Sequence, residues 1–401
     1  MTRGEVRVNR RQWWMWAIVA LAVAAAVAPL VHTWLTNPDD QRLVDLDVYR
    51  TGGQMLLEGR PVYDYYTPAP QLLPFTYPPI AAMLAVGLAV MSWETAQWVW
   101  TAGVYVTLAV TVWFSFRQAL EGEAVRRHAP WLFGLLMVAC AYLMPIRDQV
   151  RFGQVDILLV ALCVADCLAR RPWWPRGFLI GLATAVKLTP GVFLIYLLVT
   201  RQWRTFWMAA FVTTVLTLLP FAVIPRDAAG FWFSALLDPE RLGANAGTTN
   251  QSMRGMLIRL YMNGALESAI WVVLVAVVAW FGFRGAREAY LTGDRLAAVA
   301  LVGLMAVLLS PVAWIHHLAW IVVVLGALAG DGRDPARLRV AGGVWLFYVV
   351  PVPWWGVSLI AAGIPGVSVV LGKIVQDGYG LGALALVWLL AAWLPKRRQL
   401  V

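Results

Sequence analysis

Long apolar runs separated by short charged segments dominate the chain. The first run, Trp13–Trp34, is about 20 residues long, the length that an α-helix needs to cross the hydrocarbon core of a bilayer. Similar runs follow at about 94–116, 131–146, 157–169, 205–224, 269–283, 296–309, 318–329, 340–360 and 381–394. This pattern predicts an all-α polytopic membrane protein, because a helix satisfies its backbone polar groups internally, as lipid requires.

Two apolar stretches do not fit a single membrane crossing. Pro79–Met91 has about 13 residues, too few to cross, so we expect a juxtamembrane helix on the outer side. Gly177–Thr200 is longer, but arginines flank both ends and Lys187 and Pro190 lie near its centre. A broken hairpin of two short helices fits better, with its tip at membrane depth against protein or a cavity. Counting the hairpin as two, we expect about 12 transmembrane segments.

Basic residues predict the orientation. Cytoplasmic loops are rich in Lys and Arg, and four arginines precede the first run while three basic residues follow the last one. Both termini are therefore expected in the cytoplasm. Residues 35–93 then form a first periplasmic loop with juxtamembrane helices, and residues 225–268 form a second. The expected organisation is one integral membrane domain over residues 1–401, in the plasma membrane.

Composition agrees with this class and excludes others. The chain is 61% hydrophobic and 13% charged, whereas soluble domains average about 25% charged residues. The net charge of +10 does not indicate a nucleic-acid-binding protein, because the basic residues fall where the positive-inside bias puts them. Cys163 and Cys167 lie four residues apart on one predicted helix. We expect them to be buried apolar residues, because no histidine nearby completes a metal site.

Unusual polar residues collect on the predicted outer side, and Lys187 approaches them from within the membrane. Intramembrane ionisable groups are costly and are therefore functional candidates. Asp45 and Asp47 lie in an aromatic first loop over Val44–Pro79, which we interpret as a catalytic loop. The other candidates are Arg147, Asp148, Arg151, Gln154, Asp156, Asn250, Gln251, Ser252, Arg254, His316 and His317.

Each of these groups also has a purely structural interpretation. Asp45 and Asp47 are two residues apart, so they share a face in an extended segment but not on a helix. We therefore expect only one of them to point into a cavity. His316 and His317 can instead interact with lipid headgroups, and Lys187 can extend toward water. Arg147 and Arg151 can pair with neighbouring aspartates and brace their own loop; these alternatives stay open.

Seven short motifs give the chain a recognisable order. They are DLDVYR (Asp45–Arg50), GRPVY (Gly59–Tyr63), FTYPP (Phe75–Pro79), FGQVDILL (Phe152–Leu159), AVKLTP (Ala185–Pro190), NQSMRGML (Asn250–Leu257) and SPVAWIHH (Ser310–His317). Together they resemble glycosyltransferase family 87, whose members have the GT-C fold and use polyprenyl-phosphate sugars. Within the family the similarity is greatest to mycobacterial α-1,2-mannosyltransferases of phosphatidylinositol mannoside synthesis.

The resemblance implies an inverting mannosyltransferase whose active site faces the periplasm. The donor is expected to be polyprenyl-phosphate-mannose, and the acceptor a tetramannosylated phosphatidylinositol that gains one α-1,2-linked mannose. GT-C enzymes place an essential aspartate in the first external loop, and we assign this general base to Asp45. His317 and, second to it, His316 are the other catalytic candidates, with Lys187, Arg254 and Arg151 expected at the donor phosphate.

Further residues in these motifs are expected to bind substrate: Asp47, Tyr49, Arg50, Tyr63, Tyr77, Gln154, Asn250 and Gln251. No metal or other cofactor is expected, because cations suffice for a phosphate leaving group of low pKa. The expected partners are the two lipid substrates and membrane lipids, and the protein is expected to be a monomer.

Three other functions compete with this interpretation. An arabinosyltransferase that uses decaprenyl-phosphoryl-arabinose would differ only in its sugar pocket. A lipid-linked sugar transporter is expected to show paired half-repeats with matching broken segments, and the sequence shows one broken segment. A structural scaffold gives no reason for the polar motifs to converge.

Overall fold

The computed structural model describes residues 10–38, 41–123 and 125–398. The helices before the break at Lys187 are α1 (Arg10–Leu35), α2 (Val44–Leu57), α3 (Pro79–Ala89), α4 (Trp93–Leu120), α5 (Ala129–Ala141), α6 (Met144–Phe152), α7 (Asp156–Leu168) and α8 (Phe178–Val186). After it come η2 (Thr189–Gly191), α9 (Val192–Val199), α10 (Trp203–Val223), α11 (Pro225–Phe233), η3 (Ala235–Leu237), η4 (Pro239–Leu242), α12 (Met253–Ile258), α13 (Gly264–Leu291), α14 (Arg295–Leu308), η5 (Ile315–Trp320), α15 (Ile321–Ala329), α16 (Pro335–Val349), α17 (Val352–Ala361), α18 (Ser368–Gln376), α19 (Gly378–Trp388), the π-helical η6 (Leu389–Trp393) and α20 (Leu394–Arg398). Within these ranges extended pairing is limited to two isolated bridges.

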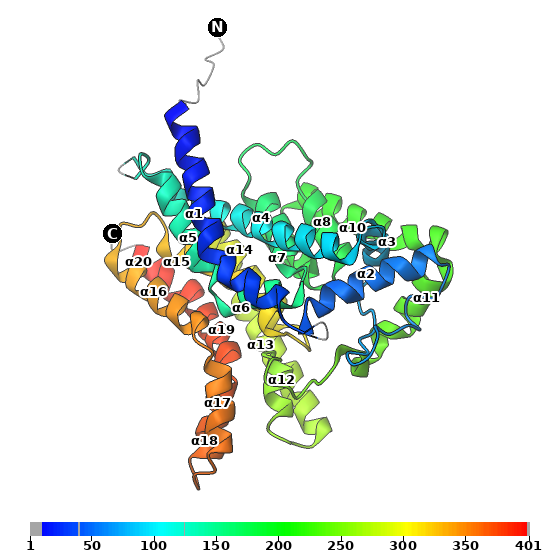
Figure 1. Ribbon diagram of the computed structural model, residues 1–401. Coiled ribbons are helices and arrows are strands. Elements are labelled where there is room, and N and C mark those ends of the chain that lie inside the picture. Colours follow the sequence, from blue (N-terminus) through cyan, green and yellow to red (C-terminus); the bar gives the residue numbers. More distant parts are fainter. Residues whose placement is uncertain (1–9, 39–40, 124, 399–401) are drawn as a thin grey trace.

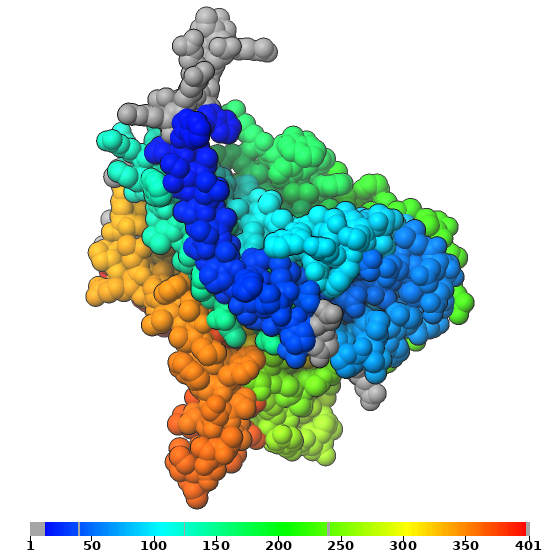
Figure 2. Space-filling model, in the orientation of Figure 1, coloured from blue at the N-terminus to red at the C-terminus, as the bar shows by residue number. Residues whose placement is uncertain are grey.

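Burial separates a protein core from a lipid-facing periphery. The side chains of α15 are buried throughout, as are those of α14 beyond its first residue. In contrast, only 11% of the residues in the most apolar part of α13 are buried. The corresponding fraction is 17% in α1 and 17% in α10. Apolar helices this exposed are unfavourable in water and favourable in a bilayer. Figure 2 shows α1 as a ridge on the surface, and α17 and α18 project together from the body (Figure 1).

The helix lengths fit a multi-pass membrane protein. Five described helices are long and apolar enough to cross a bilayer, or up to seven if the bent pairs α5–α6 and α16–α17 each count as one span. Shorter apolar helices lie at 79–89, 189–199, 295–308 and 315–329. The all-helical membrane class predicted from the sequence is confirmed; the figure of about 12 spans stays a prediction.

The first loop is more regular than expected. The prediction of a loop over Val44–Pro79 was wrong for its first 14 residues, which form α2. Two adjacent glycines in α2 allow close packing: a Cβ on Gly53 would lie 2.6 Å from the Ala85 carbonyl oxygen of α3, and one on Gly52 would lie 2.7 Å from the Phe75 ring. Pro79 begins α3, where its missing N–H costs nothing. The two helices therefore form one unit.

The long apolar segment after α7 is broken, as predicted. The last residue of α8 is Val186, Lys187 adopts an extended conformation, and a short 3-10 turn at Thr189–Gly191 leads into α9. The Lys187 nitrogen still donates to the Ala183 carbonyl oxygen of α8 at 3.0 Å, and the helical path ends at this residue. In the segment 225–268 the chain forms α11, two 3-10 turns and α12 rather than one open loop.

Candidate active site

A cavity of about 690 Å³ lies where the first loop, the break after α8, the segment 231–243 and the turn before α15 meet. Residues from segments far apart in sequence line it, including Asp45, Gln154, Lys187, Arg241, His316 and His317. Six of the predicted site residues thus line one cavity: Asp45, Tyr77, Gln154, Lys187, His316 and His317. Its wall is mixed in character, with aromatic and aliphatic side chains beside the charged ones.

Asp45 and Asp47 point to different places. They lie in the first turn of α2, where successive residues are about 100° apart, so the two side chains diverge by about 200°. Asp45 lines the main cavity, whereas Asp47 lines a separate pocket with Arg50 and Trp93. As the sequence predicts, only one of the two carboxylates faces the cavity.

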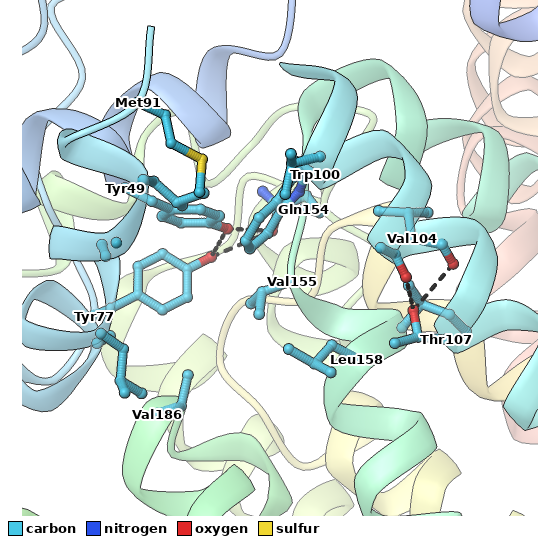
Figure 3. Close-up of a pocket in the computed structure, with 18 residues that line it drawn as sticks. Tyr49, Tyr77, Met91, Trp100, Val104, Thr107, Gln154, Val155, Leu158 and Val186 are labelled. Atoms are coloured by element: carbon cyan, nitrogen blue, oxygen red, sulfur yellow. Dashed lines mark hydrogen bonds between the residues drawn. The ribbon is translucent and has the colours of Figure 1, made fainter. Parts of the chain in front are cut away.

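Gln154 connects Asp45 to two buried tyrosines. Its side-chain oxygen lies 3.2 Å from the hydroxyls of both Tyr49 and Tyr77, which are 2.9 Å apart (Figure 3). This leaves the amide nitrogen of Gln154 to donate to Asp45. Gly153 fixes the position of Gln154, because its φ of 72° ends α6 and a Cβ there would lie 2.7 Å from Leu46 of α2.

Burial raises the pKa of Asp45 from its ordinary value of 3.8 to about 7. Desolvation is the largest cause, since it disfavours the charged carboxylate; the hydrogen bond from Gln154 and the charge of Lys187 oppose it, and Asp156 adds to it. A carboxylate that titrates near neutrality is suited to accept a proton from a hydroxyl group. Asp45 is therefore the candidate general base at the cavity wall.

Lys187 lies at the centre of a buried polar cluster. Its ammonium nitrogen is 2.8 Å from Asp156 Oδ1 and 3.0 Å from His317 Nε2, and 5.3 Å from the centre of the Tyr77 ring. An ammonium group has only donors, so Nε2 of His317 accepts and the ring is neutral. Lys187 can direct its third hydrogen into the cavity, where it would contact an anion.

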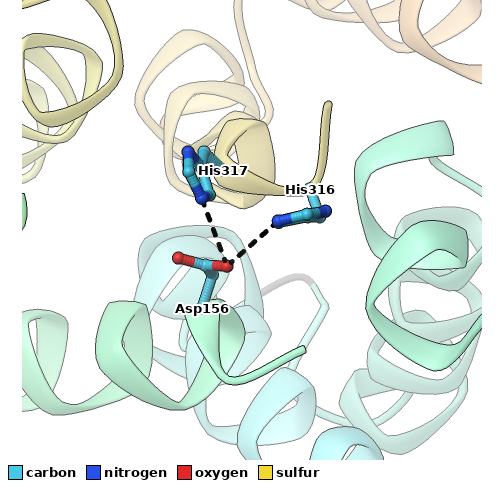
Figure 4. A group of neighbouring side chains, drawn as sticks. All are labelled: Asp156, His316 and His317. Atoms are coloured by element: carbon cyan, nitrogen blue, oxygen red, sulfur yellow. Dashed lines mark ion pairs between the residues drawn. The ribbon is translucent and has the colours of Figure 1, made fainter. Parts of the chain in front are cut away.

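Asp156, His316 and His317 form a group that resembles a metal site. One ligand atom from each lies within 4.8 Å of the others, and Asp156 Oδ2 is 3.8 Å from His316 Nε2 and 3.9 Å from His317 Nε2 (Figure 4). Lys187 contacts two of the three residues at hydrogen-bonding distance. Its ammonium thus already supplies positive charge to the carboxylate. The donor set is a poor fit for a divalent ion while Lys187 stays in place.

The histidine turn is held rigidly. Gln149 of α6 donates from Nε2 to the backbone oxygen of His316 at 2.8 Å, and its Oε1 lies 3.4 Å from the Ile157 nitrogen at the start of α7. Gln149 is fully buried, so these bonds are shielded from water. The bonds tie the two histidines to the segment that carries Asp156.

A second, apolar cavity of about 460 Å³ adjoins the polar one. Residues of α3, α4 and α7 line it, with Leu84, Leu88, Val99, Trp100, Val104 and Leu158 among them. Tyr77 and Gln154 line both cavities. Several residues that line the groove are also exposed on the surface, Leu84 by 57% and Val99 by 48%. The groove thus runs from the lipid-facing surface to the polar groups, a path that suits a long hydrocarbon chain.

Three predicted binding residues lie elsewhere and make structural contacts. Arg254 pairs with Glu267 at 3.2 Å and packs on the Trp271 ring. The Arg151 guanidinium packs against the rings of Trp34 and Phe152. None of these contacts places either guanidinium at the main cavity. Arg50 donates to the Met91 carbonyl oxygen at 3.0 Å.

Three other predicted binding residues do not line the cavity but make hydrogen bonds that hold neighbouring segments together: Tyr63, Asn250 and Gln251. Asn250 is fully buried and its Oδ1 accepts from the backbone nitrogen of Ala313 at 3.0 Å. Gln251 is also fully buried, and its side chain bonds the carbonyl oxygens of Thr248 and Gln376. The Tyr63 hydroxyl donates to the Tyr77 carbonyl oxygen at 2.7 Å.

Sequence reasoning missed Arg241 and left the partner of Asp156 open. Arg241 donates to the Tyr63 carbonyl oxygen at 2.8 Å and lines the cavity, but its segment carries no motif that distinguishes it from other loop arginines. The sequence leaves open whether Arg147 and Arg151 pair with Asp148 and Asp156; in the structure the cation beside Asp156 is Lys187, at 2.8 Å.

Comparison with known proteins agrees with the motifs. The model for glycosyltransferase family 87 matches residues 75–311. A polyprenol-phosphate-mannose-dependent alpha-(1-2)-phosphatidylinositol mannoside mannosyltransferase of Mycolicibacterium smegmatis is 36% identical over 303 residues, which cover 70% of this chain and 68% of that protein. The Mycobacterium tuberculosis protein of the same name is 32% identical over 375 residues, covering 88% of this chain and 84% of that one.

A differently named relative is nearly as similar. It is a polyprenol-phosphate-mannose-dependent alpha-(1-2)-phosphatidylinositol pentamannoside mannosyltransferase of Mycolicibacterium smegmatis, 30% identical over 345 residues, with 83% of this chain and 81% of that protein covered. No solved structure matches the chain significantly. The family match covers more than half of the 401 residues and includes four of the seven motifs completely. The protein is therefore a member of glycosyltransferase family 87.

Proposed function

We propose that the protein transfers mannose from polyprenyl-phosphate-mannose to a phosphatidylinositol mannoside, forming an α-1,2 linkage. The names of its relatives state this donor, acceptor class and linkage for those proteins. One structural observation carries the proposal: an apolar groove and a polar cavity meet at Tyr77 and Gln154, beside Asp45. A lipid-linked sugar needs this combination, because its prenyl chain and its glycosyl phosphate have opposite solvation requirements.

The proposed reaction is a single displacement. Asp45 accepts the proton of the acceptor 2-hydroxyl while that oxygen attacks the anomeric carbon of mannose. The new bond is between this oxygen and the anomeric carbon, and the bond to the phosphate oxygen breaks. A β-linked donor thereby gives an α-linked product with inversion, and the polyprenyl phosphate leaves with the bonding electron pair.

Cationic and polar side chains would stabilise the leaving phosphate. Lys187 has a hydrogen free of Asp156 and His317, and Arg241 supplies a second cation at the cavity wall. The Lys187 side chain is only 13% exposed, and Arg241 is held against the first loop by its bond to the Tyr63 carbonyl oxygen. Electrostatic stabilisation is stronger at such a partly water-excluded site than in water. We propose that no metal takes part, since the Lys187 ammonium already neutralises the Asp156 carboxylate that would otherwise bind a metal ion.

The remaining cavity wall suits a carbohydrate acceptor. Tyr66 and Trp314 line the wide part of the cavity, and flat aromatic faces pack well on the apolar faces of sugar rings. We propose that these two side chains hold the mannoses of the acceptor. The tetramannosylated to pentamannosylated step remains our proposal, because the relatives divide between two acceptor descriptions.

We further propose that the enzyme acts as a monomer in the plasma membrane, with the cavity facing the periplasm and both termini in the cytoplasm. The arginine-rich turns support this orientation, since they lie at the other end of the helices from the cavity. In this orientation α3 would lie along the outer membrane surface, between the groove and the first loop.

The test is a transfer assay with purified protein in nanodiscs. Synthetic polyprenyl-phosphate-mannose is supplied with acceptors that carry two, four or five mannoses, and products are identified by mass spectrometry and α-1,2-mannosidase digestion. Mannose added to the tetramannosylated acceptor supports the proposal. Transfer from decaprenyl-phosphoryl-arabinose with no transfer of mannose would contradict it, as would transfer by Asp45→Asn at the wild-type rate.

A further inference from the structure

A second polar pocket, of about 330 Å³, lies at the far end of α4 from the groove. Four arginines line it: Arg117 from α4, Arg170 and Arg176 from the turn after α7, and Arg295 from the start of α14. Arg117 is 17 residues beyond Trp100 of the groove, or about 25 Å along the helix at about 1.5 Å per residue. The pocket is thus separate from the active site.

The arginines outnumber the carboxylates near them. Glu121 pairs with Arg170 at 2.6 Å and lies 4.0 Å from Arg117. Two further acids lie nearby: Asp166 accepts from the backbone nitrogens of Gly177 and Ile180, and Asp294 accepts from the Ala297 nitrogen at the start of α14. Four arginines thus face three carboxylates, two of which bind backbone N–H groups. The pocket therefore keeps an excess of positive charge, which favours an anionic ligand.

Backbone contacts hold two of the guanidinium groups in place. Arg176 donates to the carbonyl oxygens of Asp166 and Ala169 at the end of α7. Arg117 donates to the Leu168 carbonyl oxygen at 3.5 Å. A guanidinium has five N–H donors, so each of these side chains keeps hydrogens for a ligand. Because they are already positioned, binding costs less side-chain entropy.

The lining is not only basic. Phe114, Leu168 and Leu296 form an apolar part of the same pocket, and the neighbouring helix α4 is one of those long enough to cross a membrane. Basic pockets between membrane helices are typical binding sites for phosphate-bearing lipid headgroups. A free phosphate would use the guanidinium groups but not the apolar part.

We propose that this arginine pocket, defined by Arg117, Arg170, Arg176 and Arg295, binds the phosphate of an anionic phospholipid in the leaflet at that end of the helices. The positive-inside bias accounts for basic residues at this end, but not for their convergence from three segments on one pocket. The site does not depend on the proposed transferase activity, because it shares no residue with the catalytic cavity.

The test compares two double variants that remove the same charge. Arg117→Gln/Arg295→Gln changes the pocket, and Arg333→Gln/Arg339→Gln changes arginines outside it. Arg333 belongs to the turn whose Gly332 lies beside Ala119 of α4, so the control is at the same end of the molecule. Lipid retention is measured by native mass spectrometry after exchange into detergent with phosphatidylglycerol or phosphatidylcholine.

We expect wild type and the control variant to retain phosphatidylglycerol about tenfold more strongly than the pocket variant does, with little retention of phosphatidylcholine. Equal retention by the two double variants would overturn the proposal. Thermal protection by millimolar inorganic phosphate that matches protection by phosphatidylglycerol would overturn the lipid assignment. If the pocket variant aggregates, the single change at exposed Arg295 gives the same comparison. Mannose transfer is measured in parallel and is expected to persist in all variants that fold.

Discussion

Asp45 links catalysis to pH at the scale of a single residue. Because its pKa is raised to about 7, only part of the enzyme carries the basic carboxylate at neutral pH. We predict that kcat/KM rises about tenfold per pH unit below pH 7 and levels off above it. Initial rates of mannose transfer between pH 5 and pH 9 give the profile. A rate that stays constant from pH 5 to pH 7 would show that another group accepts the proton.

The same residue predicts a difference between activity and stability. Asp45→Asn removes the proposed general base, so we expect transfer to fall by about 10²- to 10⁴-fold. Folding raises the pKa of Asp45, so the folded state binds more protons than the unfolded state between pH 3.8 and about 7, and stability falls as pH rises through this window. The asparagine variant lacks this penalty. Its Tm is expected to exceed that of wild type at pH 8 and to approach it at pH 4; a lower Tm at pH 8 would contradict the assignment.

The buried pair of Lys187 and Asp156 predicts a second comparison. Lys187→Met leaves the Asp156 carboxylate without its cation, and breaking a buried pair on one side costs about 3–5 kcal/mol. Adding Asp156→Asn removes the stranded charge. We expect the double variant to recover thermal stability but not mannose transfer, because the phosphate would still lack its ammonium. Recovery of both would assign Lys187 a purely structural role.

Prediction of single residues succeeded where one short motif contains both the functional side chain and the local sequence features that position it. The sequence predicted that only one of Asp45 and Asp47 faces the cavity, although it left open whether their segment is helical. The break in the long apolar segment was predicted, and Lys187 lies at the cavity there. Prediction did less well where the partner comes from a distant segment. Arg254 belongs to a motif, yet Glu267 lies 13 residues further on and pairs with it, and Arg241 reaches the cavity through a fold that no local pattern encodes.

At the scale of elements, the groove between α3 and α4 predicts how the donor lipid binds. An added Cβ on Gly103 of α4 meets no atom within 4 Å, so a bulky side chain there projects into open space beside the groove. We predict that Gly103→Phe raises the KM for a long-chain prenyl donor at least about tenfold and changes kcat little. A donor with a short chain, which needs less of the groove, is expected to be nearly unaffected.

A matched control comes from α16. Gly342 also has open space around an added Cβ, and it does not line the groove. Gly342→Phe is therefore expected to leave the KM of both donors unchanged. Equal KM values for the long-chain donor in the two phenylalanine variants would show that the hydrocarbon chain lies elsewhere.

Element prediction depended on which force dominates locally. Pro79 and the short apolar run after it indicated α3. Lys187 with Pro190 indicated the break, because a charge at membrane depth is costly. Proline alone is not decisive, since Pro29 lies inside α1 and Pro220 inside α10. The helix α2 was missed because adjacent Gly52 and Gly53 have low helix propensity. Their close contacts with Phe75 and Ala85 compensate through tertiary packing, which the sequence pattern does not display.

At the scale of the whole molecule, the orientation in the membrane predicts labelling from one side. Glu58 follows α2 and is exposed, and Trp173 in the arginine-rich turn is 92% exposed. In intact cells, an impermeant maleimide is expected to label Glu58→Cys, but to label Trp173→Cys only after permeabilisation. Background is low because Cys140 and Cys163 are buried, and Cys167→Ser removes the third thiol. The reverse pattern would invert the proposed topology.

The whole-molecule class was predictable, whereas the number of spans was not. Apolar composition alone separates a membrane protein from a soluble one. Span counting assumes helices of about 20 residues that face lipid, but α14 and α15 are buried by other helices and have 14 and 9 residues. A helix surrounded by protein need not match the bilayer thickness, so its ends follow neighbouring contacts instead.

The common boundary of the two cavities has a kinetic consequence. Tyr77 and Gln154 line both the apolar groove and the polar cavity. The donor lipid and the acceptor therefore have separate binding places and can be bound at the same time. Turnover should then pass through a ternary complex, giving intersecting rather than parallel double-reciprocal lines. The polyprenyl phosphate product should be a competitive inhibitor with respect to the donor. With respect to the glycolipid acceptor it should be a noncompetitive inhibitor. The enzyme would therefore slow down when recycling of its carrier lipid lags, however abundant the acceptor becomes.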